Sequence, residues 1–182
     1  MPDETDGLLR RAQLARGEKR FADAQRDLLL AVEVLRREGS REDLAQALRE
    51  LGELERRLPD ADAARRHYEE AVAIFREVGE PLRLAHTVRH LGDVHRAAGR
   101  ADLAEPCYHE ALALYRGRED ARPLDLANAI RSLAVLKDDA GDLDEARRLW
   151  QEAHDLYAAL GVAEGVAGTA AHLARLAPRG EM

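Results

Sequence analysis

The stretch ARRLWQEAHDLY (residues 146–157) contains a pattern that occurs four times in the chain. An alanine is followed four residues later by a bulky residue and, three residues after that, by a second alanine. Such spacing places all three side chains on one face of a helix. Small residues let two helices approach closely, and the bulky one fills the space between them, so each trio predicts a packed helix pair. The trios are Ala24–Leu28–Ala31, Ala64–Tyr68–Ala71, Ala104–Tyr108–Ala111 and Ala146–Trp150–Ala153.

These trios belong to a longer internal repeat. The Leu-Gly pair at 51–52 recurs at 91–92, and a Leu-Ala pair stands at the equivalent place in the next repeat, 133–134. The second interval is slightly longer than the first, and its extra positions lie in the connection RGREDARP (116–123). They therefore lengthen a loop and leave the helices unchanged. A constant period of about 40 residues is typical of a stacked array of helix pairs.

Each repeat divides into two helices joined by a short turn. Turns such as AAGRAD (97–102) and DAGDLD (139–144) contain a glycine and an aspartate that can cap the next helix. We therefore expect a single array over residues 6–177, preceded by a disordered tail at 1–5 and followed by a frayed tail at 178–182. The expected repeats cover residues 6–40, 41–80, 81–122 and 123–162, and a closing helix covers 163–177.

Composition agrees with an all-α fold and narrows the function. Ala, Leu, Arg and Glu, which favour helices, dominate the chain, and only 4% of residues are aromatic. The net charge of −7 argues against a nucleic-acid-binding protein, which needs a basic face. The single cysteine fits a reducing compartment, and no apolar run approaches the length of about 18 residues that predicts a membrane span. We expect a cytoplasmic protein with no nucleic acid or membrane partner.

The pattern resembles the tetratricopeptide repeat family, in which the first helix of a pair carries Leu-Gly and the second carries Ala-x3-aromatic. The resemblance covers nearly the whole chain and implies a right-handed α-solenoid of four helix pairs plus a closing helix. The period of about 40–42 residues exceeds the roughly 34 of the common form. It is similar to that of kinesin light chains and of many bacterial regulatory proteins. In the first repeat, Arg11 and Ala12 replace Leu and Gly, as a polar capping repeat requires.

No motif for catalysis or cofactor binding is present in the sequence. Phosphate-binding loops, nucleophile elbows, HExxH and CxxC motifs are all missing. His86, His90 and Asp93 have the spacing of metal ligands on one helix face. Seven histidines in a helical chain produce such a pair by chance, so we interpret the group as a solvated polar face and predict no metal. The sequence therefore predicts a protein that is not an enzyme and needs no cofactor.

A column of arginines marks the candidate binding site. Arg49, Arg89 and Arg131 occupy one position in three successive first helices, and the resemblance implies that these helices line a concave groove. Guanidinium groups about 10 Å apart suit the carboxylates of an extended acidic peptide. The candidate groove residues are Arg49, Arg89, Arg131, Asn128, His86, His90, Gln46 and Asp93.

An alternative interpretation leaves these arginines without a ligand. Glu53 and Asp93 follow Arg49 and Arg89 by four residues, a spacing that favours ion pairs within one helix. Arg131 lacks such a partner because Val135 stands at that place. If ligand anchors exist, Arg131 and Asn128 are the best candidates.

The resemblance implies a non-enzymatic scaffold or adaptor that binds a peptide or a helix of another protein in its groove. An alternative is a peptide-sensing regulatory subunit that acts on a partner protein. The closing helix is rich in glycine and alanine, and we expect a homodimer through it as one arrangement. Pro106 falls inside an expected helix, so we predict a late helix start or a bend there.

Overall fold

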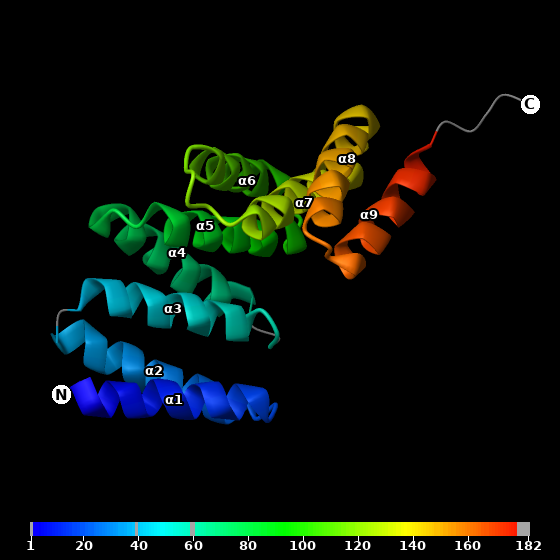
Figure 1. Cartoon of the computed structure of the whole chain (residues 1–182). Coiled ribbons are helices and arrows are strands. Elements are labelled where there is room, and N and C mark those ends of the chain that lie inside the picture. Colours follow the sequence, from blue (N-terminus) through cyan, green and yellow to red (C-terminus); the bar gives the residue numbers. More distant parts are fainter. Residues whose placement is uncertain (1, 39, 59–60, 178–182) are drawn as a thin grey trace, which may run out of the picture. The chain divides into compact units, whose positions relative to one another are not determined.

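The computed structural model describes residues 2–38, 40–58 and 61–177, and within these residues the chain is built of helices joined by short turns (Figure 1). The chain divides into two compact units, residues 1–94 (unit 1) and 95–182 (unit 2). The helices are α1 (Pro2–Gly17), α2 (Phe21–Glu38), α3 (Arg41–Glu55), α4 (Ala61–Val78), α5 (Pro81–Ala97), α6 (Ala101–Arg116), α7 (Pro123–Asp139), α8 (Leu143–Ala159) and α9 (Ala163–Leu176).

The order of these helices confirms the predicted all-α class, with four consecutive helix pairs and a closing helix. Two predictions about helix boundaries are wrong. α1 begins at Pro2, so the tail expected to be disordered at residues 1–5 is largely helical, and Thr5 is buried. α6 begins at Ala101 with Pro106 inside it, because the flanking Ala104 and Tyr108 are fully buried and their packing outweighs the lost hydrogen bond. The frayed tail expected at 178–182 lies outside the described residues.

All four trios lie in the core. Every alanine in them is fully buried, and the bulky members are at most 2% exposed. The ring of Tyr68 explains the glycine of the first helix, since a Cβ at Gly52 would lie 3.1 Å from it. At the N-terminal end, Arg11 projects outward with 62% of its side chain exposed and reaches Asp27 with Nε 3.1 Å from Oδ2. This polar position on α1 agrees with a capping repeat.

The closing helix α9 is fastened to α7 and α8 by polar and aromatic contacts. His172 stacks on Trp150 with ring centroids 4.0 Å apart, and Asp138 of α7 pairs with both His172 and Arg175. Arg147 of α8 donates from Nη2 to the backbone oxygen of Leu176 at 2.6 Å. The opposite face of α9 carries exposed small residues, and a homodimer through that face stays a prediction. The exposed small residues are Ala163, Ala167, Ala170, Ala171 and Ala174.

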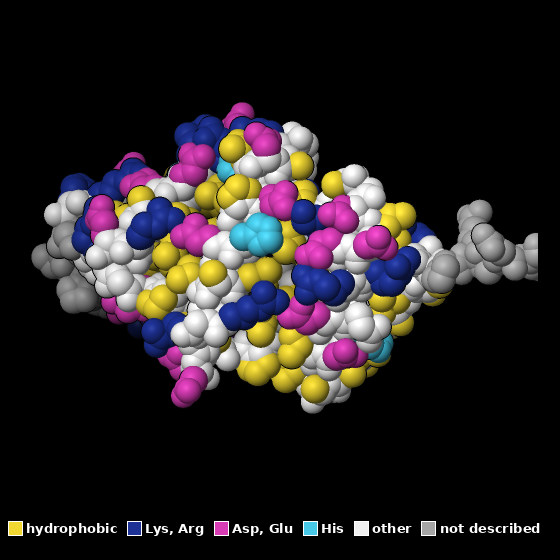
Figure 2. Space-filling model, turned by 90° about the horizontal axis from the view of Figure 1, so that it is seen from above, with side chains coloured by type: hydrophobic (Ala, Val, Ile, Leu, Met, Phe, Trp, Pro, Cys, Tyr) yellow, Lys and Arg dark blue, Asp and Glu magenta, His cyan; other side chains and the backbone are white. Residues whose placement is uncertain are grey.

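Charges of both signs are mixed on one face of the molecule. On the face shown in Figure 2, basic and acidic side chains are interspersed, with hydrophobic side chains between them. In the described part of the chain, no helix is both long and apolar enough to cross a membrane.

Candidate functional site

Unit 1 contains a hollow between two successive first helices, α1 and α3. Its volume is about 550 Å³. Four residues of α1 in its lining precede four residues of α3 by one repeat period, so the hollow follows the repeat register. The lining residues are Asp6, Leu9, Arg10, Gln13 and Arg16 from α1, and Gln46, Arg49, Glu50 and Glu53 from α3.

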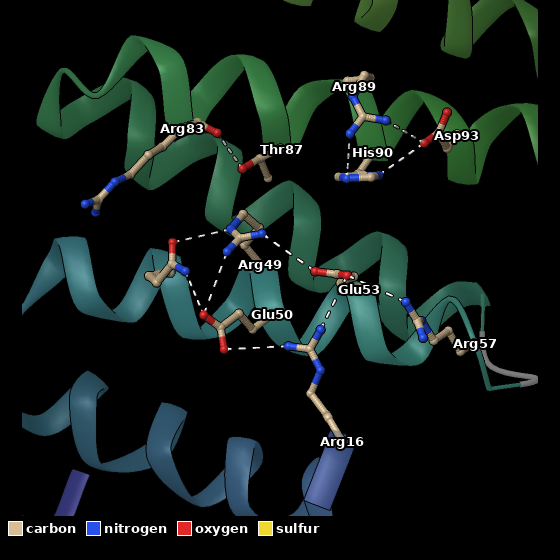
Figure 3. A network of polar contacts seen from close by, with 11 residues as sticks. Arg16, Arg49, Glu50, Glu53, Arg57, Arg83, Thr87, Arg89, His90 and Asp93 are labelled. Atoms are coloured by element: carbon tan, nitrogen blue, oxygen red, sulfur yellow. Dashed lines mark hydrogen bonds and ion pairs between the residues drawn. The ribbon is translucent and has the colours of Figure 1, made fainter. Parts of the chain in front are cut away.

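Ion pairs cross this hollow, and they engage the arginine side chains at its centre. Arg49 has only 16% of its side chain exposed and lies 3.7 Å from Glu53 and 3.8 Å from Glu50. Its Nε also donates to Gln46 at 3.3 Å. From the facing helix, Arg16 approaches Glu53 at 3.4 Å (Figure 3). These contacts favour the interpretation of Arg49 as part of an internal network that ties α1 to α3.

The next arginine of the column, on α5, is buried and belongs to a second network of polar contacts. Arg89 is 7% exposed, and its guanidinium lies 3.5 Å from Asp93 and 2.9 Å from Nε2 of His90 (Figure 3). Asp93 also forms an ion pair with Arg56, the residue that follows α3 in the same unit, at 3.6 Å. His90 stacks against Tyr68 and meets the ring of His86 edge-on, with centroids 4.7 Å apart. Among the described residues, no cluster of three or more His, Cys, Asp or Glu side chains is arranged to hold a metal ion.

Burial and charge shift the pKa values in this network. Burial alone would raise the pKa of Asp93, but the hydrogen bond from His90 and the charge of Arg89 outweigh it and bring the pKa to about 2. Burial lowers the pKa of His90 below its usual 6.5, although Asp93 opposes this shift. The network is therefore most stable with Asp93 ionised and His90 neutral.

These shifts predict that unit 1 is labile in acid. A lowered pKa of His90 makes its contribution to stability fall as the pH drops below 6.5, since the unfolded chain binds the proton more readily. The contribution of Asp93 is present above pH 3.8 and is lost as the pH falls toward 2. Asp93→Asn should therefore lower the free energy of unfolding at pH 7 by about 2 kcal/mol and flatten its pH dependence below pH 4.

Denaturant unfolding followed by circular dichroism at pH 7, 5 and 3 checks this prediction. Asp144→Asn is the matched control, because the Asp144 side chain is 98% exposed. An Asp93→Asn variant as stable as the control at pH 7 would contradict the assigned role of the network.

Unit 2 contains the corresponding hollow. It lies between α7, the first helix of the fourth pair, and the closing helix α9, which takes the place of the next first helix. Its volume is about 470 Å³. Trp150 and Tyr157, both of α8 and both at most 3% exposed, form part of its wall. The other lining residues are Leu124, Asn128 and Arg131 of α7, Val162 before α9, and Glu164, Gly165, Gly168, Thr169 and His172 of α9.

Arg131 and Asn128, the best candidate anchors from the sequence, both line this hollow, and their role as ligand anchors stays a prediction. Arg131 is exposed and has no ion-pair partner among the described residues. Asn128 is half-buried, and its Oδ1 accepts a hydrogen bond of 2.8 Å from the hydroxyl of Tyr157. The eight candidate residues thus divide between the units, with the other six in unit 1.

Several lining residues were missed at the sequence level. One signal for them was available: Gly168 follows Asn128 by one repeat period and continues the column of Gln46, His86 and Asn128 into α9. Trp150 was assigned to helix packing alone, because the alanine pattern explains its burial without any hollow beside it.

Comparison with known proteins places this geometry in a family. A family model described as Tetratricopeptide repeat matches residues 4–77 and 83–176. The chain belongs to the tetratricopeptide repeat family. Repeats of this family generally mediate protein–protein interactions. No curated protein matches the chain in sequence.

Solved structures share the fold of this tetratricopeptide repeat chain. BtubC from P. vanneervenii is 23% identical with a TM-score of 0.80, over 86% of this chain and 64% of that protein. A putative kinesin light chain from Podosopora anserina with nearly identical repeats is 16% identical with a TM-score of 0.78, over 97% and 86% of the two chains. A signal transduction ATPase with a tetratricopeptide repeat sensor from Pyrococcus horikoshii is 16% identical with a TM-score of 0.80, over 93% and 27%. These neighbours confirm the predicted similarity to long-period, kinesin-light-chain-like repeats.

Proposed function

We propose that the chain is a non-enzymatic scaffold or adaptor that holds an acidic peptide, or an acidic face of a partner's helix, in the hollow of unit 2. The observation that carries this proposal is the contrast between the two hollows. The central arginine of unit 1, Arg49, is engaged by two carboxylates, whereas Arg131 in unit 2 is exposed and unpaired within the described part of the chain. A cation without an internal partner is available to a ligand carboxylate.

The shape and lining of the hollow also support a peptide ligand. Its volume of about 470 Å³ lies within the range of roughly 300–1,000 Å³ found for small-molecule pockets, which is room for the side chains of a short peptide. Leu124, which is 38% exposed, and Val162 give it an apolar margin beside the polar groups Arg131 and Asn128. An apolar surface with a few placed polar groups is the usual composition of a recognition site. The proposed place of action is the cytoplasm, in keeping with the single cysteine.

A charge reversal at Arg131 tests the proposal. We expect Arg131→Glu to weaken binding of the native partner at least about tenfold, because an attraction becomes a repulsion in a partly enclosed site. The partner is recovered from lysate of the native host by the tagged wild-type chain and identified by mass spectrometry.

Arg66→Glu is the matched control for this experiment. It makes the same charge change at an exposed residue of α4, which also lacks an ion-pair partner among the described residues. A partner retained equally by wild type, Arg131→Glu and Arg66→Glu would remove the hollow of unit 2 from the proposal.

The likeness to a protein described as carrying a tetratricopeptide repeat sensor favours a second candidate, a peptide-sensing regulatory subunit. A scaffold and a regulator bind alike but differ in their effect on the partner. Measuring the recovered partner's own activity with and without the chain separates them, since a regulator changes that activity and a scaffold leaves it unchanged.

A further inference from the structure

The geometry points to Tyr157 as the residue that sets the recognition chemistry of the unit 2 hollow. Its hydroxyl fixes the Asn128 carboxamide as a hydrogen-bond donor beside Arg131, so that the hollow selects a short peptide that carries both a carboxylate and an aliphatic side chain. This inference rests on the proposed function and assigns the ligand's chemistry and a positioning residue.

A hydrogen bond between α8 and α7 orients the Asn128 side chain. The Tyr157 hydroxyl of α8 donates to Oδ1 of Asn128 on α7 at 2.8 Å. A free carboxamide offers either an acceptor oxygen or a donor nitrogen to a ligand. With the oxygen engaged by Tyr157, the Nδ2 group remains to donate, and Asn128 has no other hydrogen-bond partner in the described ranges.

The Tyr157 ring is itself held in place by α9. Tyr157 is 3% exposed, and a Cβ added at Gly165 would lie 2.4 Å from its Cγ. This close approach leaves the ring no room to turn away from Asn128. The hydroxyl is therefore pre-set before a ligand arrives, and such pre-organisation strengthens binding by removing an ordering cost.

Arg131 extends the donor character along α7. It lies three residues after Asn128, so the two side chains are neighbours on one helix face about 5–6 Å apart. A guanidinium has five N–H donors and no acceptor. The two polar side chains of α7 in the hollow thus offer N–H donors to a ligand, which favours carboxylate or carbonyl oxygens and disfavours a lysine.

The remaining lining defines the rest of the ligand. The Thr169 hydroxyl is buried and occupied, since it bonds to Gly165 O at 2.8 Å and to the ring of His154 at 2.9 Å. Leu124 and Val162 supply the apolar contact for an aliphatic side chain. Glu164 is the one carboxylate in the described lining, and it opposes an anionic ligand. Glu164→Gln should therefore raise the affinity for an acidic peptide about two- to threefold.

Two short peptides provide the probes for the test. They are the N-acetylated, C-amidated tetrapeptides Leu-Glu-Leu-Glu and Leu-Lys-Leu-Lys, titrated into ¹⁵N-labelled protein and followed by two-dimensional NMR. For the wild type we expect the glutamate peptide to shift the signals of residues 124–131 and 162–172, with a Kd at least fivefold below that of the lysine peptide.

Mutant cycles then isolate the role of Tyr157. Tyr157→Phe keeps the ring and removes the hydroxyl, and we expect it to raise the Kd of the glutamate peptide three- to fivefold. In an Asn128→Ala background the same change should have no further effect, because Tyr157 acts through Asn128. Without any peptide, Tyr157→Phe should also increase the fast motion of the Asn128 side-chain amide, a signal that a purely structural role leaves unchanged.

A second variant keeps the inference testable if Tyr157→Phe disturbs the fold. Asn128→Asp replaces the donor nitrogen by an acceptor at constant shape, and we expect it to abolish the preference for the glutamate peptide. An additive effect of Tyr157→Phe in the Asn128→Ala background, or an unchanged preference in Asn128→Asp, would overturn the role of Tyr157 while leaving peptide binding intact. If neither peptide perturbs the signals of the hollow, the proposed function of this site fails as well.

Discussion

We expect Trp150→Ala to lower the free energy of unfolding of unit 2 by about 3–5 kcal/mol, the usual range for removing a buried tryptophan. Trp150 is 2% exposed and lies between two fully buried alanines of its trio. It also carries the stacked ring of His172, so the change removes a contact that holds α9 on α8. The cavity and the lost stacking act in the same direction.

Hydrogen exchange measures this effect helix by helix. In Trp150→Ala we expect amides of α7, α8 and α9 to lose protection, because a repeat depends on its nearest neighbours. Amides of α1 and α2 serve as the internal control and should keep theirs. Trp150→Phe retains a ring and should cost less than half as much. A loss below about 1 kcal/mol for the alanine variant would contradict the packing role of the trio.

Two glycines of α9 should respond to alanine with opposite signs. At Gly165 a Cβ would lie 2.4–2.8 Å from atoms of the Tyr157 ring, so either the ring or α9 must move. Overpacking of this kind costs about 1–3 kcal/mol. At Gly168 nothing lies within 4 Å, and alanine gains up to about 1 kcal/mol from its helix propensity.

Denaturant unfolding followed by Trp150 fluorescence reports on unit 2 and compares the two variants directly. Gly168→Ala is the control for helix propensity, since both changes add one methyl group to the same helix. We expect Gly165→Ala to unfold at lower denaturant concentration than the wild type, and Gly168→Ala at the same or a higher one. Equal stabilisation by both would contradict the close contact between α8 and α9.

Local patterns in the sequence were sufficient to predict the helices and their pairing. The trio of alanine, bulky residue and alanine has one physical meaning, a tight helix–helix contact, and every trio is buried as that meaning requires. Pro106 shows where local reasoning fails. The proline rule predicts a late start or a bend. The late start is wrong, because α6 begins at Ala101 and runs through the proline with Ala104 and Tyr108 buried, and the bend stays a prediction.

The site was predictable only where it depends on spacing within one helix. Pairs four residues apart, Arg49–Glu53 and Arg89–Asp93, form as the sequence indicated. Contacts between different helices are not marked by any fixed spacing in the sequence. The pairing of Arg16 with Glu53 and the bond from Tyr157 to Asn128 join residues far apart in the chain, so their geometry follows from how the repeats pack.

Hydrogen exchange of the chain with and without its recovered partner tests most directly whether recognition lies in the hollow of unit 2. The account predicts slower exchange on binding within residues 124–131 and 162–172, the two segments that contain the lining residues before and within α9 and in α7. It predicts unchanged exchange in α1 and α3, whose hollow is crossed by internal ion pairs. Slower exchange confined to α1 and α3 would contradict the account and place recognition in unit 1.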